Sequence, residues 1–370
     1  WKRVEGETVV LEDDGDWDAF ADALQSADLV VDALLGTGTR GAPRGAIERA
    51  VEALEDAEAP VVAVDIPTGI DADTGHVEGV CVHADLTVTL ALPKRGHFLF
   101  PGRSFTGDVE WVDIGIPPEA EVVEPGTEVW VTTVEDVVEH LPERDPEMHK
   151  GDRGRLLVVG GSAGLTGAVC LAAEAAVRAG AGLVTAGVPR GLQDLVATKL
   201  TEAMTLALPQ LEASRALSRE AFDSILLHQP GRLDAMVLGP GIGRHASTQA
   251  LVRAVIENVE LPIVLDADGL FAMSPALHAL AGDGGAPRLV LTPHLGEFAA
   301  LTGLAPAEIA GRRLELAAEW ARRWNAVVVL KGAPTVIADL DGETIVLNPT
   351  GSEALATGGT GDVLAGLIGG

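Results

Sequence analysis

Short apolar segments of strand length alternate with amphipathic segments of helical spacing along most of the 370 residues. The apolar segments at 29–35, 61–66, 86–92 and 109–114 are rich in Val and Ile, and a helical segment begins near Pro43. Such alternation predicts parallel sheets covered by helices on both faces. We therefore expect an α/β fold.

A change of composition divides this alternation into two series. Residues 117–153 are acidic and contain several prolines, with one or two short elements expected around 129–141. We predict one domain at 1–118, a linker at 119–145 and a second domain at 146–370. In the second domain we expect strands at 156–159, 183–188, 235–238, 263–266, 289–292 and 327–330, helices at 167–179 and 306–324, and a hairpin at 335–347 turned by Asp341-Gly342.

The charge of the chain limits its partners. It carries 55 acidic and 26 basic residues, a formal net charge of −29, which argues against nucleic acid or an anionic membrane as partner. No apolar run reaches the roughly 18 residues of a membrane span. Few of the basic residues are Lys, which favours a high-salt cytoplasm or GC-rich codon use. The chain begins at Trp1 and stops at Gly370 within a helical pattern, so we expect a piece cut at both ends.

In the first series, glycines and carboxylates follow neighbouring strands. Gly36-Thr37-Gly38-Thr39-Arg40-Gly41 fits a dinucleotide-binding GxGxxG loop, although a tight turn without ligand is an equal alternative. Asp65 and Thr68 follow the next strand, and Asp32 lies at the same edge. These oxygens suit a hard cation or acid–base chemistry, while helix capping or a surface position is the alternative. Lys94 ends the third strand at that edge.

The second series carries the strongest motif, the glycine-rich segment 356–366 before an apolar helix. Such a loop offers unpaired N–H groups to a phosphate, and Asp362 is placed to accept a proton from a substrate hydroxyl as that oxygen is phosphorylated. The alternative is an ordinary N-capping Asp. Three further groups follow strands: Lys331 to Thr335, His294 with Glu297, and the glycines of 160–161 and 239–243. Together they predict a cleft for phosphorylated ligands.

These motifs resemble those of bifunctional NAD(P)H-hydrate repair enzymes, in which an epimerase domain precedes an ADP- or ATP-dependent dehydratase domain. DALLGTGTRG, VVAVDIPTGID and ADLTVTLALPKRG are similar to the epimerase half. HKGDRGRLLVVGGSAGLTGA, AGAGLV, LGPGIG, LDADGL, LTPHLGE, VVLKGAPT and ATGGTGDVLAG are similar to the dehydratase half, in the family's order. The resemblance implies a Rossmann-like epimerase domain without its N-terminal part and a ribokinase-like α/β domain without its C-terminal part.

The resemblance also implies roles for individual residues. The catalytic residues would be Asp65 in the epimerase and Asp362 in the dehydratase. Thr68 stands where the family more often has Ser, and Leu165 and Val169 where it often has Tyr and Pro. The family's potassium-binding Asn would precede Trp1. The implied sites are Gly36, Thr37, Gly38, Thr39, Arg40, Gly41, Ala42 and Asp65 for the hydrated cofactor in the epimerase, Asp32 and Thr68 for potassium, Ala168, Gly241, His294 and Asp362 for the hydrated nicotinamide in the dehydratase, and Lys331, Gly332, Ala333, Pro334, Thr335 and Gly361 for the adenine nucleotide.

The expected activity is therefore repair of a nicotinamide cofactor. R and S hydrates of NADH or NADPH would be interconverted, and the S form dehydrated with ADP or ATP, Mg²⁺ and K⁺. We expect a cytoplasmic homo-oligomer that acts on small molecules. The alternatives, in order, are a ribokinase-like kinase for a hydroxymethylpyrimidine or thiazole alcohol, a nicotinamide dehydrogenase, and a nucleotide-binding module with an inactive epimerase half.

Overall fold

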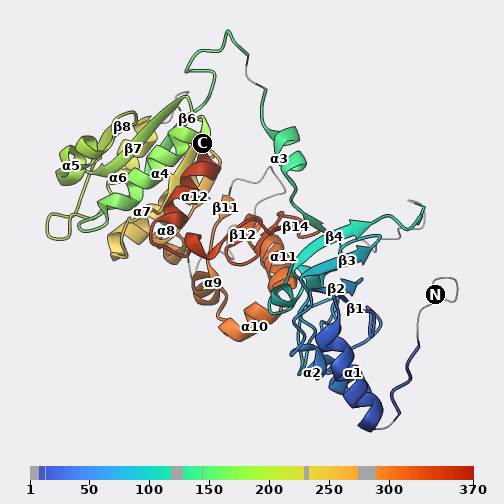
Figure 1. Cartoon of the computed structure of the whole chain (residues 1–370). Coiled ribbons are helices and arrows are strands. Elements are labelled where there is room, and N and C mark those ends of the chain that lie inside the picture. The colour runs from blue at the N-terminus through green and yellow to red at the C-terminus, as the bar shows by residue number, and fades with distance from the viewer. Residues whose placement is uncertain (1–7, 13, 118–127, 144, 229–232, 274–288) are drawn as a thin grey trace. The chain divides into compact units, whose positions relative to one another are not determined.

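The computed structural model describes residues 8–12, 14–117, 128–143, 145–228, 233–273 and 289–370 (Figure 1). The chain divides into two compact units, Trp1–Val123 and Glu124–Gly370. Both contain a largely parallel sheet with helices, so the α/β prediction is confirmed.

The first unit has a four-stranded parallel sheet in the order β1-β2-β3-β4. Val51 of a helix packs with Val61 and Val82 to form the core on one face of the sheet. The four predicted strands are present, although shorter than predicted. The elements are α1 (Asp14–Ser26), β1 (Val30–Asp32), α2 (Ala46–Leu54), β2 (Val61–Val64), β3 (Leu86–Leu90), the 3₁₀ segments η1 (Arg95–His97) and η2 (Gly102–Phe105), and β4 (Asp108–Val112).

The opposite face of this sheet differs from the prediction. Val31, Val64, Leu90 and Val112 share that face, as the strand registers require, and all four side chains are exposed. In the described part of the first unit, helices thus cover one face of the sheet only. The prediction of cover on both faces is wrong for these residues.

The second unit has a ten-stranded sheet in the order β5-β14-β13-β12-β11-β10-β9-β6-β7-β8. All neighbouring strands are parallel except β13, which is antiparallel to β12 and β14 and forms the predicted hairpin. The strands are β5 (Val129–Val131), β6 (Arg155–Val159), β7 (Leu183–Pro189), β8 (Met204–Leu208), β9 (Ala235–Leu238), β10 (Ile263–Leu265), β11 (Leu289–Leu291), β12 (Val327–Leu330), β13 (Thr335–Ala338) and β14 (Ile345–Asn348).

Strand β5 lies in the segment expected to be a linker. It is one of the short elements predicted at 129–141, and it pairs in parallel with β14 at the edge of the large sheet. The segment 119–145 therefore contributes a strand to the second unit in addition to connecting the two units.

Helices α4 and α12 pack closely against each other in the second unit (Figure 1). Gly366 permits this approach, because a Cβ there would lie 2.1 Å from the carbonyl oxygen of Ala172. Ala365, Val169 and Val158 belong to the core between these helices and the sheet. The helices are α3 (Val134–His140), α4 (Thr166–Ala179), α5 (Gln193–Lys199), α6 (Ala221–His228), α7 (Ala246–Asn258), α8 (Asp268–Ala272), α9 (Leu295–Thr302), α10 (Pro306–Gly311), α11 (Arg313–Trp324) and α12 (Thr360–Gly369), with the 3₁₀ segments η4 (Arg190–Leu192) and η6 (Glu353–Leu355).

The helix predicted at 306–324 is two helices. The chain leaves helical geometry at Arg312, with φ −137° and ψ 36°, so α10 ends and α11 starts afresh. The break follows Gly311, a residue that favours the helix interior least among the non-proline types. The periodicity of the apolar residues continues across the break, which explains why one long helix was predicted.

Candidate functional site

Three neighbouring strands of the second unit bring polar side chains together at their carboxyl ends. Asp266 follows β10, Thr292 follows β11 and Lys331 follows β12. The Lys331 Nζ donates a hydrogen bond to Asp266 Oδ1 at 2.9 Å, and the Thr292 hydroxyl donates to the same oxygen at 2.7 Å. The carboxyl edge of parallel strands is where ligands bind in open α/β sheets. The predicted cleft thus has a polar centre.

The Lys331–Asp266 ion pair is shielded from water. The two side chains are 18% and 2% exposed, and the Glu297 carboxylate lies 3.8 Å from the Lys331 Nζ. Removing charges from water is expensive unless they are paired and hydrogen-bonded, as they are here. Asp266 and Thr292 were not among the predicted site residues. The only signal for them was that LDADGL and LTPHLGE resemble motifs of the family.

Glycines allow the loops around this centre to approach one another. A Cβ on Gly239 would lie 2.0 Å from the carbonyl oxygen of Asp266, and one on Gly160 would lie 2.2 Å from that of Pro240. Ala267, next to Asp266, has a φ of 52°. Non-glycine residues in the left-handed region cost free energy and concentrate at functional sites. The backbone around Asp266 is therefore closely constrained.

Two residues predicted to bind the hydrated nicotinamide, Gly241 and Ala168, are neighbours in space. A Cβ on Gly241 would lie 3.0 Å from the Ala168 Cβ and 2.6 Å from the Leu165 carbonyl oxygen. The Ser162 hydroxyl donates to the Gly241 carbonyl at 2.9 Å, which joins the two glycine-rich loops. The structure thus brings this predicted pair together at the start of α4.

Helix α12 begins beside the ion pair without a side-chain cap. Its N-cap is Gly359, at φ 97°, so Asp362 lies in the first turn and is not the N-cap. A Cβ on Gly361 would lie 3.4 Å from the Lys331 Nζ and 3.8 Å from Asp266 Oδ2. The first N–H groups of an α-helix have no partner within the helix and attract anions. Gly361 and Lys331 are therefore placed to contact one phosphate group.

The Asp362 carboxyl has an altered proton affinity. Burial, and after it the negative charge of Asp266, raise its pKa to about 6, while the Lys331 ammonium partly opposes them. A carboxylate of this kind is a stronger base than an exposed one. Asp362 is therefore suited to accept a proton near neutral pH.

His294 has a structural role besides its predicted place at the nicotinamide site. Its Nδ1 accepts hydrogen bonds from the N–H groups of Gly296 and Glu297, and Glu297 Oε2 accepts one from the His294 N–H. This reciprocal arrangement caps α9. The ring is 60% exposed, so the same contacts fix a histidine that a ligand can reach.

The predicted nucleotide-binding segment, Lys331 to Thr335, is held from behind by Arg313. One guanidinium nitrogen donates to the carbonyl oxygens of Leu330, Lys331 and Pro334, at 3.2, 3.3 and 3.0 Å. The Thr335 hydroxyl donates to the Gly332 carbonyl at 3.1 Å. These contacts shape the loop after β12, although Arg313 was not predicted as a site residue.

In the first unit, the predicted potassium ligands Asp32 and Thr68 lie side by side. The Thr68 hydroxyl and N–H donate to the two carboxylate oxygens of Asp32, both at 2.8 Å, and both residues are buried. The Leu35 N–H donates to the Thr68 hydroxyl at 3.0 Å. This pair joins the loop after β1 to the loop after β2. Two oxygen ligands alone do not complete the coordination of a cation.

Asp65 has strained backbone and a lysine partner. Its φ is 71°, and its Oδ1 accepts hydrogen bonds from the Leu90 N–H at 3.0 Å, the Thr89 hydroxyl at 3.2 Å and the Lys94 Nζ. Burial alone would raise the pKa of Asp65, but the hydrogen bonds from Lys94, Leu90 and Thr89 outweigh it and lower the pKa. The structure thus pairs Lys94 with Asp65, whereas the sequence indicated only that Lys94 lies at the same edge of the sheet.

The glycine-rich loop after β1 is open. A Cβ on Gly36 or Gly38 would meet nothing within 4 Å, and neither residue has positive φ, whereas Gly41 does. Packing and backbone geometry therefore do not require glycine at 36 and 38, which favours close approach of a ligand over a tight turn. Helix α2 starts only at Ala46, and Arg40 pairs with Asp73 at the surface.

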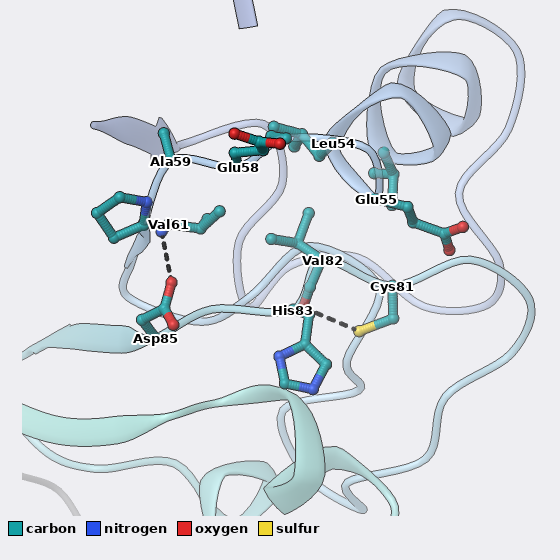
Figure 2. Close-up of a pocket in the computed structure, with 12 residues that line it drawn as sticks. Leu54, Glu55, Glu58, Ala59, Val61, Cys81, Val82, His83 and Asp85 are labelled. Atoms are coloured by element: carbon teal, nitrogen blue, oxygen red, sulfur yellow. Dashed lines mark hydrogen bonds between the residues drawn. The ribbon is translucent and has the colours of Figure 1, made fainter. Parts of the chain in front are cut away.

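A pocket of the first unit lies at the other end of the strands. Figure 2 shows it between α2 and the segment before β3, near Val61 and Asp85 at the amino ends of β2 and β3. None of the predicted site residues lines it. Its Cys81 thiol is buried, which raises the pKa to about 12 and leaves it unreactive at neutral pH.

Comparison with known proteins decides the family. A family model described as NAD(P)H-hydrate dehydratase matches residues 156–370, and a model described as YjeF-related protein N-terminus matches residues 1–96. The chain belongs to the NAD(P)H-hydrate dehydratase family. The resemblance stated from the motifs is thereby confirmed.

Several relatives match along nearly the whole chain. The bifunctional NAD(P)H-hydrate repair enzyme Nnr of Moorella thermoacetica is 48% identical over 94% of this chain and 64% of its own length. The Escherichia coli protein of the same name is 36% identical over 93% of this chain and 62% of its own. The chain therefore spans slightly less than two thirds of these relatives.

A solved structure matches part of the chain. The ADP/ATP-dependent NAD(P)H-hydrate dehydratase from Bacillus subtilis, co-crystallised with ATP/Mg²⁺, is 36% identical, covers 66% of this chain and 80% of its own, and has a TM-score of 0.53. A ribokinase-like superfamily protein from Enterococcus faecalis, 24% identical with a TM-score of 0.54, matches in fold. The predicted ribokinase-like domain is confirmed.

The described residues offer no complete metal centre. Among them, no group of three or more His, Cys, Asp or Glu side chains could hold a metal ion. Mg²⁺ typically keeps several waters and binds largely through substrate phosphates, so a nucleotide bound at this edge would itself supply most of its ligands. No helix in the described ranges is both long and apolar enough to cross a membrane.

Proposed function

We propose that this chain carries the two activities of a nicotinamide cofactor repair enzyme. The first unit interconverts R and S hydrates of NADH or NADPH, and the second dehydrates the S form with ADP or ATP. The single observation that carries the proposal is the arrangement of Asp362, in the uncapped first turn of α12, beside Lys331 and Asp266. The family to which the chain belongs supports the substrate class.

In the dehydratase unit, the transferred phosphoryl group lies against the N–H groups of the first turn of α12 and the Lys331 ammonium. Asp362 accepts the proton of the C6 hydroxyl while the oxygen of that hydroxyl bonds to phosphorus. The phosphate ester then breaks at its C–O bond, a proton leaves C5, and the C5–C6 double bond of the dihydronicotinamide is restored. ATP yields ADP and phosphate, and ADP yields AMP and phosphate.

The two ligand classes occupy different parts of this edge. The hydrated nicotinamide lies near Gly241 and Ala168, where the loops after β6 and β9 meet α4, and His294 follows β11 at the same edge of the sheet. The adenine nucleotide lies along the segment 331–335 and Gly361. Mg²⁺, when bound with the nucleotide, supplies neutralisation of charge on the phosphate oxygens. Asp362 stands between the two sites as the base.

In the epimerase unit, Asp65 and Lys94 form the acid–base pair. The carboxylate holds the ammonium close, so a proton can be given to or taken from the C6 oxygen as the hydrate changes configuration. The open loop Gly36 to Ala42 receives the rest of the cofactor. Asp32 and Thr68 would supply two oxygen ligands for K⁺.

We propose a cytoplasmic homo-oligomer as the working form. The exposed apolar face of the first sheet, with Val31, Val64, Leu90 and Val112, favours self-association because exposed apolar surface of this kind is costly in water. The substrates are small molecules of the cytoplasm. Equilibrium sedimentation at several salt concentrations would measure the mass, and a monomer throughout would contradict this proposal.

The dehydratase assay supplies NADH hydrate, Mg²⁺ and either ADP or ATP in molar KCl, and follows the return of NADH absorbance together with released phosphate. We expect both to rise only when nucleotide is present. The epimerase assay follows the ratio of R to S hydrate by proton NMR without nucleotide. A stable phosphorylated product in place of free phosphate would instead support a ribokinase-like vitamin kinase.

A further inference from the structure

Asp266 neither accepts the proton nor binds the phosphate in the proposed reaction, yet it is closely held by its neighbours. Its side chain is 2% exposed, and one carboxylate oxygen accepts hydrogen bonds from both Lys331 and Thr292. The next residue, Ala267, has left-handed backbone, and Gly239 leaves room for the Asp266 carbonyl where any Cβ would collide. Such constraint indicates that the exact position of this carboxylate matters.

The other atoms near Asp266 belong to the phosphate-binding edge. A Cβ on Gly361, in the first turn of α12, would lie 3.4 Å from the Lys331 Nζ and 3.8 Å from Asp266 Oδ2. A lysine ammonium normally samples many rotamers on a flexible stem, so a fixed position requires a partner. Here the partner is Asp266 at 2.9 Å, and a Glu297 carboxylate oxygen lies 3.8 Å from the same ammonium nitrogen.

We propose that Asp266 is a positioning residue of the dehydratase site: it fixes the Lys331 ammonium below the first turn of α12 and keeps a negative charge facing Asp362. This inference rests on the proposed dehydratase function. The first effect sets where the phosphate chain of the nucleotide lies. The second strengthens Asp362 as the base, because a nearby negative charge makes a carboxylate hold a proton more firmly.

The charges around Asp362 support this assignment. The charged groups that act on it are Asp266, which raises its pKa, and Lys331, which lowers it, while burial contributes most. Glu297, in the first turn of α9, lies 3.8 Å from the Lys331 Nζ, and His294 is the N-cap of that helix. Removing the charge of Asp266 would leave Lys331 without its hydrogen-bonded carboxylate. Both consequences lower the pKa of Asp362.

The test compares the wild-type chain with Asp266→Asn, which keeps the shape and removes the charge. We expect kcat for dehydration to fall at least tenfold at pH 7.5 and the acidic limb of the pH–rate profile to move down by about one pH unit. The dissociation constant for ADP with Mg²⁺, measured by calorimetry, should change less than about fivefold, because Lys331 and the α12 N–H groups remain. Lys331→Met should weaken nucleotide binding more.

A matched control removes one carboxylate at the opposite edge of the same sheet. Asp234 accepts a hydrogen bond from the Arg155 N–H at 2.8 Å, at the amino ends of β6 and β9, and Asp234→Asn should keep both kcat and the acidic limb. Thr292→Val removes one hydrogen bond to Asp266 without changing the charge. It should lower kcat less than Asp266→Asn, and it replaces that variant as the test if Asp266→Asn fails to fold.

The outcomes distinguish a failure of the proposed function from a failure of the positioning role of Asp266. If the wild-type chain regenerates no NADH from the hydrate, the proposed function fails. If the wild-type chain is active and Asp266→Asn, or Thr292→Val in its place, keeps the wild-type kcat and acidic limb, the positioning role is refuted. A loss of kcat that is rescued in Asp266→Glu, with the acidic limb restored, supports the role, since a merely structural defect would leave the limb unmoved.

Discussion

The protonation of Asp362 gives the sharpest prediction for the dehydratase. Its pKa is raised to about 6, by burial first and by the Asp266 charge second. A base must be ionised to act, so dehydration is lost as the pH falls through this value. With a pKa of about 6, roughly nine tenths of Asp362 is ionised at pH 7 and roughly one tenth at pH 5. The rate should therefore fall about tenfold between these values.

An exposed aspartate would behave differently. With the ordinary pKa of about 3.9, more than nine tenths would still be ionised at pH 5, and the rate would hardly change. The assay measures initial rates of NADH return and phosphate release at saturating hydrate and nucleotide from pH 5 to 8. A flat profile in that range would refute the argument. Asp362→Asn, which cannot accept the proton, should lower kcat by two to four orders of magnitude.

Three further changes probe other parts of the chain. Lys94→Met should slow epimerisation at least tenfold, because Asp65 loses its ammonium partner. The rate is measured by NMR of the R and S hydrates, with dehydration of S hydrate in the same sample as the control. Unchanged epimerisation would contradict the pairing. Gly239→Ala should prevent folding of the second unit, because the φ of Gly239 is +126° and the added Cβ would lie 2.0 Å from the Asp266 carbonyl oxygen. A circular dichroism melting curve like that of the wild type would refute this prediction. Trp324→Ala should lower the free energy of unfolding by about 3–5 kcal/mol, since the ring is fully buried against Phe298 and Trp320. Denaturant titration measures this loss, and a value below about 1 kcal/mol would contradict the packing.

Much of the fold follows from local sequence patterns. Strands such as β2, β6 and β9 were predicted because a buried parallel strand is a short run of β-branched and aliphatic residues. The hairpin of β13 and β14 was predicted from Asp341-Gly342 in its turn. Helix α4 was placed to within one residue. These features are local, so a single sequence contains the information.

Other features depend on partners distant in the chain. The pairing of β5 with β14 joins segments more than two hundred residues apart, and nothing in residues 129–131 indicates that neighbour. The break at Arg312 is invisible to apolar periodicity, which continues across it. The exposed face of the first sheet likewise depends on which elements are present to cover it.

In the candidate site, too, some residues have a local signature in the sequence and others depend on distant partners. Motif resemblance led us to predict Asp362, Lys331, Gly241 and His294 as site residues, because glycine-rich loops and strand ends leave a local signature. It did not find Asp266, whose role arises only when β10, β11 and β12 lie side by side. Nor did it pair Lys94 with Asp65, since 29 residues separate them and only the sheet brings them together. Side-chain partnership across strands is a property of the fold.

In the proposed dehydratase reaction, NADH is restored from its hydrate at the expense of a nucleotide phosphate. The most direct measurement is the ratio of phosphate released to NADH regenerated, with purified S hydrate, Mg²⁺ and ADP or ATP. The account predicts one phosphate for each NADH, and neither product without nucleotide or in Asp362→Asn. Nucleotide consumption that yields a stable phosphorylated product and no NADH would contradict it.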